Sequence, residues 1–321
     1  GAIVQISAVE IPSLAGQTEF AISAILVEDG QAVQQGQILA HLDSSGGGHQ
    51  LISPQAGYVV GLRAAPGAAV HAGQILCYIC PRPSIPASQT GILAEANNPT
   101  GIDASTVILF GGGGHGKITI DLIRAMGTYR ILGIIDDGLP AGSSVMGVPV
   151  LGGAKDLPEL YRRGVRLAVN TVGGIGNVAA RLKIFEILEE SGFICPALIH
   201  PSAVVERSAW VDAGVQIFAH AYVGSEARIG FGSVINTAGI VHHDCVLGKV
   251  VNISPGATLA GSVIVEDHAQ IGMLATVNVK VTVGAGALLG NGCTVKADVP
   301  PGMRVRAGAI WPEPRQKPPQ D

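Results

Sequence analysis

The sequence predicts a multidomain β and α/β protein that ends in a repetitive β-solenoid. From Ile199 to Val295 an aliphatic residue recurs at every sixth position without a slip. A period of six fits neither a helix (3.6) nor a strand (2), but it fits a solenoid whose unit is one short strand and a corner. Residues 105–196 alternate apolar strands with helical spacing, and residues 1–80 contain short apolar runs between glycine and proline turns.

Composition narrows the classes of function. A net charge of −4 over 321 residues gives no reason to expect a nucleic acid or an anionic membrane as partner. The first residues lack a basic segment followed by an apolar one, and no apolar run approaches the ~20 residues that span a bilayer, so we expect a cytoplasmic protein without membrane contact. Cys77 and Cys80 form a lone C-x-x-C in an apolar run, which fits a buried strand end better than a zinc or redox site. No metal site is predicted.

Residues 1–80 consist of two halves that echo each other, 27–39 and 64–76. They resemble the biotinyl/lipoyl-carrier domain, a flattened β-barrel of two pseudo-symmetric halves. In that family the modified lysine precedes a segment that reads here 52–58, and Gly46 stands in its place. No lysine precedes Lys117, so neither lipoate nor biotin is expected, and a docking role toward an unknown partner is the prediction. Residues 81–104, rich in Pro, Ala, Ser and Asn, predict a linker.

Residues 105–196 predict a small domain with a parallel sheet. The expected elements are strands at Thr106–Phe110, Arg130–Ile135 and 166–172, and helices over 117–126 and around Val178–Glu190. Gly111, Gly113 and Gly116 satisfy G-x-G-x-x-G, with Asp136 twenty residues after Gly116, a pattern that alone indicates NAD. The unit is about half of a two-lobed dinucleotide domain, and no domain for hydride transfer is evident. An NAD enzyme is therefore the least favoured alternative.

The hexads resemble the left-handed parallel β-helix of hexapeptide-repeat acyltransferases, in which three hexads form one coil and residues 18 apart stack. Together with the preceding unit they resemble nucleotide-sugar N-acetyltransferases and the related sialic-acid O-acetyltransferases. The resemblance rests on Gly-Gly-His-Gly after the first strand, on Asp136-Asp137 after the second, and on segments 199–203, 235–237, 243–245 and 253–257. It implies a Rossmann-like domain over 105–196 that binds a nucleotide-linked amino sugar, a β-helix over 197–302 and a tail over 303–321. It also implies acetyl-CoA as co-substrate and a homotrimer with active sites between subunits.

His243 is the predicted general base. Asp244 follows it where the family carries an acid, and a carboxylate can hold an imidazole in one tautomer. The base accepts a proton while the amine attacks the thioester directly. The 18-residue register puts Gly261 one coil beyond His243, where a glycine leaves a backbone N–H accessible to the oxyanion. Cys245 occupies an inward slot and is poorly placed as a nucleophile.

The resemblance implies further binding residues. For coenzyme A they are Asn252, Gly261, Met273 and Asn291, and for the nucleotide sugar they are Gly113, Gly114, His115, Asp136, Asp137 and Gly173. Asn252 replaces a second histidine of many relatives, His242 stands where an acid is common, and segment 308–312 replaces the usual exit motif. Two alternatives stay open: a sugar hydroxyl as acceptor, as in sialic-acid O-acetylation, and a catalytically silent trimeric scaffold.

Overall fold

The structure, a computed structural model, describes residues 7–13, 18–28, 31–60, 62, 65–80, 102–173 and 176–313. The chain forms two compact units: residues 1–172 with 183–196, and residues 173–182 with 197–321. Most of the predicted linker, residues 81–101, lies outside the described residues. In the part that is described, no helix is long and apolar enough to cross a membrane, and no three His, Cys, Asp or Glu side chains gather as a metal ion would require.

The N-terminal domain is a pair of four-stranded sheets. The first has the order β1 (Ser7–Glu10), β8 (Ile75–Cys80), β6 (Gly57–Val60), β3 (Ala32–Val33), and the second the order β5 (Gly47–Ile52), β4 (Ile38–Ser44), β2 (Glu19–Ile25), β7 (Ala69–His71). Alternate residues of β2 face inward, so that Phe20 and Ile22 are buried between exposed neighbours. Gly46 lies in the β4–β5 turn, where its N–H donates to Ser44 Oγ at 3.3 Å. The predicted lipoyl-like barrel is confirmed, with its hairpin closed by small residues.

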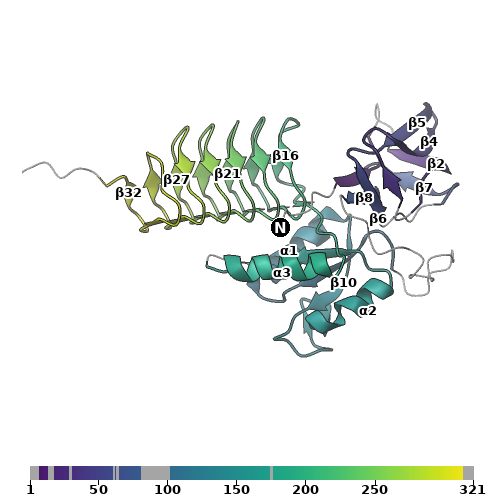
Figure 1. Ribbon diagram of the computed structural model, residues 1–321, viewed down its shortest axis with the longest axis horizontal. Coiled ribbons are helices and arrows are strands. Elements are labelled where there is room, and N and C mark those ends of the chain that lie inside the picture. Colours follow the sequence, from purple (N-terminus) through teal and green to yellow (C-terminus); the bar gives the residue numbers. More distant parts are fainter. Residues whose placement is uncertain are drawn as a thin grey trace, which may run out of the picture. The chain divides into compact units, whose positions relative to one another are not determined.

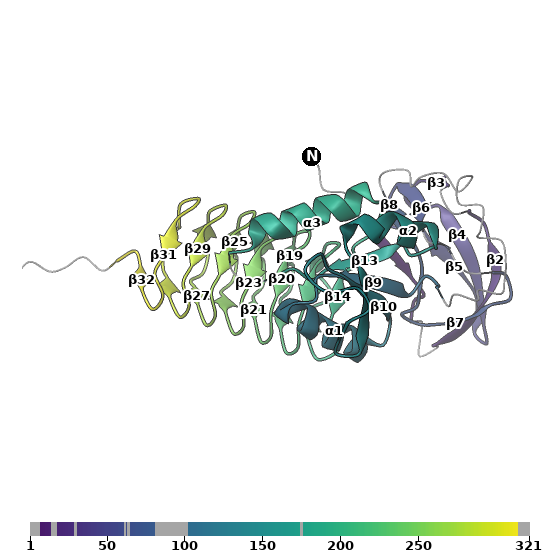
Figure 2. The ribbon, with the colours of Figure 1, turned by 90° about the horizontal axis from the view of Figure 1, so that it is seen from below.

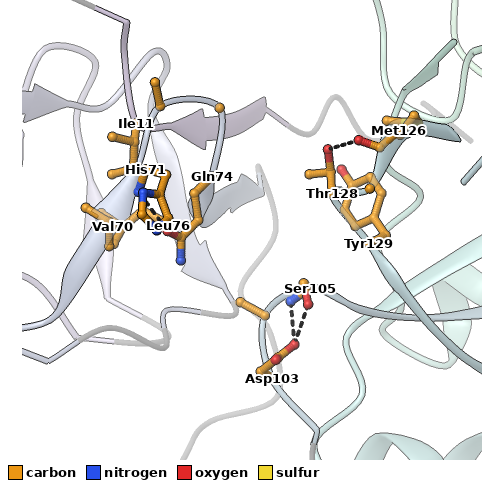
Figure 3. A pocket seen from close by; sticks show the side chains of 14 residues that line it. Ile11, Val70, His71, Gln74, Leu76, Asp103, Ser105, Met126, Thr128 and Tyr129 are labelled. Carbon is orange, nitrogen blue, oxygen red and sulfur yellow. Dashed lines mark hydrogen bonds between the residues drawn. The ribbon is translucent and has the colours of Figure 1, made fainter. Parts of the chain in front are cut away.

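The α/β domain has a five-stranded sheet of order β11-β12-β10-β9-β13. Its strands are β9 (Thr106–Phe110), β10 (Arg130–Ile135), β11 (Ser144–Val145), β12 (Val148–Gly152) and β13 (Leu167–Asn170), and only β11 is antiparallel to its neighbour. The helices are α1 (Gly114–Met126), the 3₁₀ turn η2 (Ala154–Asp156), α2 (Leu157–Arg162) and α3 (Val178–Glu190). Before β9, Asp103 accepts hydrogen bonds from the N–H and the hydroxyl of Ser105, at 2.9 and 2.6 Å (Figure 3).

Helix α1 begins at Gly114, three residues before the predicted start. Gly113 adopts an extended conformation at the N-cap, so the helix starts inside the glycine loop. It ends at Gly127, whose φ of 66° is left-handed and whose N–H donates to the Ile123 carbonyl. The N-terminal turn of α1 is therefore built from the glycine-rich segment itself.

The hexads form three parallel sheets, one on each face of a coil, and the predicted β-helix is confirmed (Figures 1 and 2). Face 1 consists of β14 (Leu198–Ile199), β17 (Gln216–Ile217), β20 (Val234–Ile235), β23 (Asn252–Ile253), β26 (Gln270–Ile271), β29 (Leu288–Leu289) and β31 (Arg304–Val305). Face 2 consists of β15 (Val204–Val205), β18 (Tyr222–Val223), β21 (Ile240–Val241), β24 (Thr258–Leu259), β27 (Thr276–Val277), β30 (Thr294–Val295) and β32 (Ile310–Trp311). Face 3 consists of β16 (Trp210–Val211), β19 (Arg228–Ile229), β22 (Val246–Leu247), β25 (Ile264–Val265) and β28 (Thr282–Val283).

From β14 to β30 the second residue of each two-residue strand is the hexad aliphatic, and from Ile217 to Val295 every one is buried. Strands 18 residues apart pair in parallel, as in Val223 with Val241 and Val241 with Leu259. Corners turn through one residue with positive φ, for example Asp244 at 58° and Ser262 at 60°. The stacking that the six-residue period predicts therefore holds along the coils.

The β-helix continues beyond residue 302, where the sequence analysis ends it. Strands β31 and β32 pair with β29 and β30, so residues 304–311 form part of the helix and not of a tail. The pairing of Val295 with Trp311 spans 16 residues, which breaks the hexad count. In the shortened corner the Asp298 carboxylate accepts the Thr282 N–H at 2.8 Å and provides a side-chain acceptor there.

Candidate active site

His243 lies in the corner between β21 on face 2 and β22 on face 3. Its Nδ1 is 2.7 Å from Asp244 Oδ2, and the two side chains are 52% and 57% exposed. Because a carboxylate accepts, this contact keeps the proton on Nδ1 and leaves the Nε2 lone pair for a substrate. The Asp244 N–H donates to the Ser225 carbonyl one coil earlier at 2.9 Å, which fixes the backbone under the pair.

Gly261 lies one coil beyond His243, at the register the sequence predicts. The neighbouring Ser262 N–H donates to the His243 carbonyl at 2.9 Å. A Cβ on Gly261 would be 2.5 Å from His243 Cε1 and 2.6 Å from Nε2, so the imidazole lies directly over this glycine. Gly261 is consequently buried, whereas the sequence analysis expects an accessible amide. Among the described residues no acceptor takes the Gly261 N–H.

Gly224 also packs against the corner that holds His243, although the sequence does not single it out. It lies one coil before His242, and a Cβ there would be 2.7 Å from the His243 nitrogen and 2.8 Å from the His242 carbonyl carbon. Gly224 thus packs against the His243 backbone from the coil before, and Gly261 packs against its ring from the coil after. The available signal was a pair of corner glycines one coil on either side of adjacent histidines.

Cys245 follows the pair and points into the helix. It is fully buried, and its thiol donates to the Ala260 carbonyl at 3.1 Å. Burial raises the pKa of the Cys245 thiol, so the thiolate needed for nucleophilic attack is disfavoured. This agrees with the prediction that Cys245 serves packing.

The residues predicted to contact coenzyme A do not all lie beside His243 in one chain. Asn252 is on face 1, where its Nδ2 donates to Ser254 Oγ at 2.9 Å. Met273 and Asn291 share the corner between faces 1 and 2, and Asn291 Oδ1 accepts the Met273 N–H at 2.9 Å. Met273 is 46% exposed. One copy of the β-helix therefore distributes the predicted set over separate corners and faces.

In the α/β domain, the glycine loop leads directly into α1. Gly113 and Gly114 are exposed, and a Cβ on either would meet no protein atom within 4 Å. Packing within the protein therefore does not require glycine at these positions, which leaves room for a ligand to approach the backbone. His115, in the first turn of α1, is half-buried. The first N–H groups and the dipole at this helix N-terminus suit an anion such as a phosphate.

The two acidic residues after β10 have different surroundings. Both oxygens of Asp136 accept backbone N–H groups, Oδ2 from Gly112 at 2.7 Å and Oδ1 from Gly138 at 2.8 Å, so this side chain holds the glycine loop. Asp137 is exposed, and its Oδ1 accepts the Ala154 N–H at 2.8 Å. Among the described residues nothing bonds to Asp137 Oδ2, which is free to accept from a ligand.

Gly173, the last of the predicted substrate residues, belongs to the other compact unit. Its carbonyl accepts a hydrogen bond from Asn177 Nδ2 at 2.9 Å. The same stretch is tied to face 1, because the Gly176 N–H donates to Gln270 Oε1 at 2.8 Å. Gly173 is thus anchored through its own segment to the β-helix.

Two family models match the chain. Residues 106–188 match the PglD N-terminal domain, and residues 7–79 match the model described as biotin-requiring enzyme. These matches cover the α/β domain and the N-terminal pair of sheets.

Relatives and solved structures with named activities match between 61% and 64% of the chain. A GDP-perosamine N-acetyltransferase of Escherichia coli O157:H7 is 30% identical over 207 residues, which cover 61% of this chain and 91% of the relative. The structure of PerB from Caulobacter crescentus in complex with CoA and GDP-perosamine is 34% identical, with a TM-score of 0.59, over 63% of this chain and 94% of that one. The acetyltransferase domain of PglB from Neisseria gonorrhoeae in complex with acetyl coenzyme A is 35% identical, with a TM-score of 0.57, over 64% and 97%.

Proposed function

The chain belongs to the hexapeptide-repeat N-acetyltransferases that use acetyl-CoA to acetylate nucleotide-linked amino sugars, and we propose that His243 is its general base and a 4-amino-6-deoxy sugar its acceptor. The observation that carries the proposal is the His243–Asp244 pair, 2.7 Å apart, lying over Gly261. It supplies a base with a free Nε2 and, next to it, an amide without a protein acceptor.

The reaction needs no covalent enzyme intermediate. The sugar amine attacks the thioester carbonyl of acetyl-CoA while Nε2 of His243 takes its proton, and Asp244 stabilises the imidazolium. The oxyanion of the tetrahedral intermediate accepts the Gly261 N–H, and the thioester oxygen enters beside the imidazole ring that covers this glycine. Collapse releases the thiolate of coenzyme A, which takes the proton back from the imidazolium.

The acceptor is held through its nucleotide. The diphosphate binds at the N-terminus of α1, over Gly113, Gly114 and His115. The nucleobase donates a hydrogen bond to the free oxygen of Asp137. Asp136 positions this loop from behind through its bonds to Gly112 and Gly138. The curated relative and the PerB structure name GDP-perosamine, which supports an amine in preference to a hydroxyl as acceptor.

We propose a homotrimer, in which a second copy brings its Asn252, Met273 and Asn291 toward His243. The separation of these residues within one copy supports this, as do the exposed apolar side chains of face 3: Trp210 (58%), Val246 (42%) and Ile264 (43%). We propose a cytoplasmic location for the protein.

Residues 1–80 act as a docking module without lipoate or biotin. They contain five acidic residues and one arginine, so this segment alone has the net charge of −4 of the whole chain. This negative charge suits a basic partner.

The test is thiol release from acetyl-CoA with GDP-, UDP- and dTDP-linked 4-amino-6-deoxy sugars, comparing the protein with His243→Ala. The proposal is supported if the variant loses turnover while a thermal shift shows that it still binds coenzyme A. The nucleotide sugar that is turned over then identifies the nucleobase. Release with sialic acid and with none of the amines would move the assignment to O-acetylation. No release and no coenzyme A binding would leave a scaffold, and an NADH fluorescence change would revive the dinucleotide alternative.

A further inference from the structure

Two aromatic rings, those of Tyr222 and His242, form a row that ends at the ring of the proposed base. Tyr222, on β18, has its ring centroid 6.0 Å from that of His242, at an interplanar angle of 61°. The His242 ring is 4.9 Å from the His243 ring at 80°, an edge-to-face arrangement. At the far end the Tyr222 hydroxyl donates to Glu206 Oε1 at 3.3 Å. The row Glu206, Tyr222, His242 thus ends on the imidazole that Asp244 holds from another side.

We propose that His242 is a positioning residue, which fixes the plane of the His243 ring, and that Tyr222 supports His242 in this role. The inference rests on the proposed function, because it assumes that His243 is the base. Neighbouring side chains of an extended strand point to opposite sides, so these two rings meet only because the chain bends at this corner.

A second contact is needed because one hydrogen bond holds one atom. The bond from Nδ1 to Asp244 is a single constraint on a ring that turns about both χ1 and χ2, so the imidazole can still pivot, and more than half of each side chain of the pair is exposed. Gly261 contributes space and no side chain that could limit the pivot. The ring of His242 is the group that can restrict this pivot, and Nε2 then stays above Gly261.

The experiment compares His242→Ala with His242→Phe, which keeps a flat ring and removes both nitrogens. An edge-to-face ring contact has a strength that corresponds to a population change of about 3- to 10-fold. We expect kcat of His242→Ala to fall by about this factor, with KM for both substrates nearly unchanged, and His242→Phe to restore most of it. Tyr222→Ala should give a smaller loss of the same kind. A crystal structure of His242→Ala should show the His243 ring displaced from Gly261.

His220→Ala is the matched control, since His220 is an exposed histidine in another corner of the same β-helix, and its kcat should not change. Equal kcat for His242→Ala and the unmodified protein, or equal losses for the Ala and Phe variants, would overturn the positioning role. His243→Ala is run in parallel. If it keeps full turnover, the proposed base is wrong; if it loses turnover while His242→Ala does not, only the positioning role is wrong.

Discussion

Replacing Gly261 by alanine tests the contact on which the proposed site depends. The new Cβ would be 2.5 Å from His243 Cε1 and 2.6 Å from Nε2. Carbon atoms in contact are about 3.5 to 4.0 Å apart, so the imidazole must move by about 1 Å. A misplacement of about 1 Å can reduce a rate by about 100-fold, and the methyl group also crowds the amide proposed to bind the oxyanion. We therefore expect kcat for amine acetylation to fall at least 100-fold.

The fold should tolerate this change. The φ of Gly261 is not in the left-handed region, and the exposed His243 side chain can swing toward solvent. The midpoint of thermal unfolding should therefore shift little, and kcat should be measured by thiol release at saturating acetyl-CoA and sugar. Ala285→Ser is the matched control, because it adds one atom at the equivalent position of another corner. A Gly261→Ala variant with near-normal kcat would refute the argument, since it would show that neither the ring position nor the amide matters.

Asp244→Asn keeps the side-chain shape and loses the charge, so kcat should fall about 10- to 150-fold, the range for a hydrogen bond to a charged group; an unchanged kcat would contradict the role of the pair. Cys245→Ala should keep kcat within about twofold, with no acylated cysteine in mass spectra after incubation with acetyl-CoA alone, whereas a large loss would point to covalent catalysis. Burial raises the pKa of the Cys245 and Cys293 thiols above the ordinary value, so the unfolded chain loses these protons first as pH rises. The free energy of unfolding, from urea titrations, should hold below about pH 8.5 and decline above it, less steeply in Cys245→Ala. Asp137→Asn should raise KM for the nucleotide sugar with little change in kcat, and a fall in kcat alone would contradict a role in binding.

The sequence predicts the β-helix and the centre of its site because both follow from the six-residue period, which gives 18 residues per coil. Once three hexads form a coil, Gly261 must lie beside His243, and the structure places it there. The position of the ring itself depends on side-chain torsions, which a period does not specify, so the burial of Gly261 was missed. The hydrogen bond from the Gly112 N–H to Asp136 could not be predicted for another reason. It joins residues 24 apart, which follow two neighbouring strands of a sheet.

The two misplaced boundaries have local causes. Glycine is a poor helix former, so helical spacing alone starts α1 at residue 117, although Gly113 provides the N-cap and the helix begins at Gly114. The end of the β-helix was set too early because two residues are absent from the corner after Val295, and a strict count of six stops there. Asp298 bonds to the Thr282 N–H in that corner, a contact that no periodicity shows.

The β-helix can lack two residues in the corner after Val295 and still form the site, because that corner lies away from His243. In a strand, a shift of one residue exchanges inward and outward side chains, so any change of count between 243 and 261 would remove the glycine from beneath the imidazole. The corner after Val295 lies two coils beyond Gly261, and there the change of two residues keeps Val299 and Val305 buried. The regular register is thus required where His243, Asp244 and Gly261 meet, and it is relaxed where only the closure of the core depends on it.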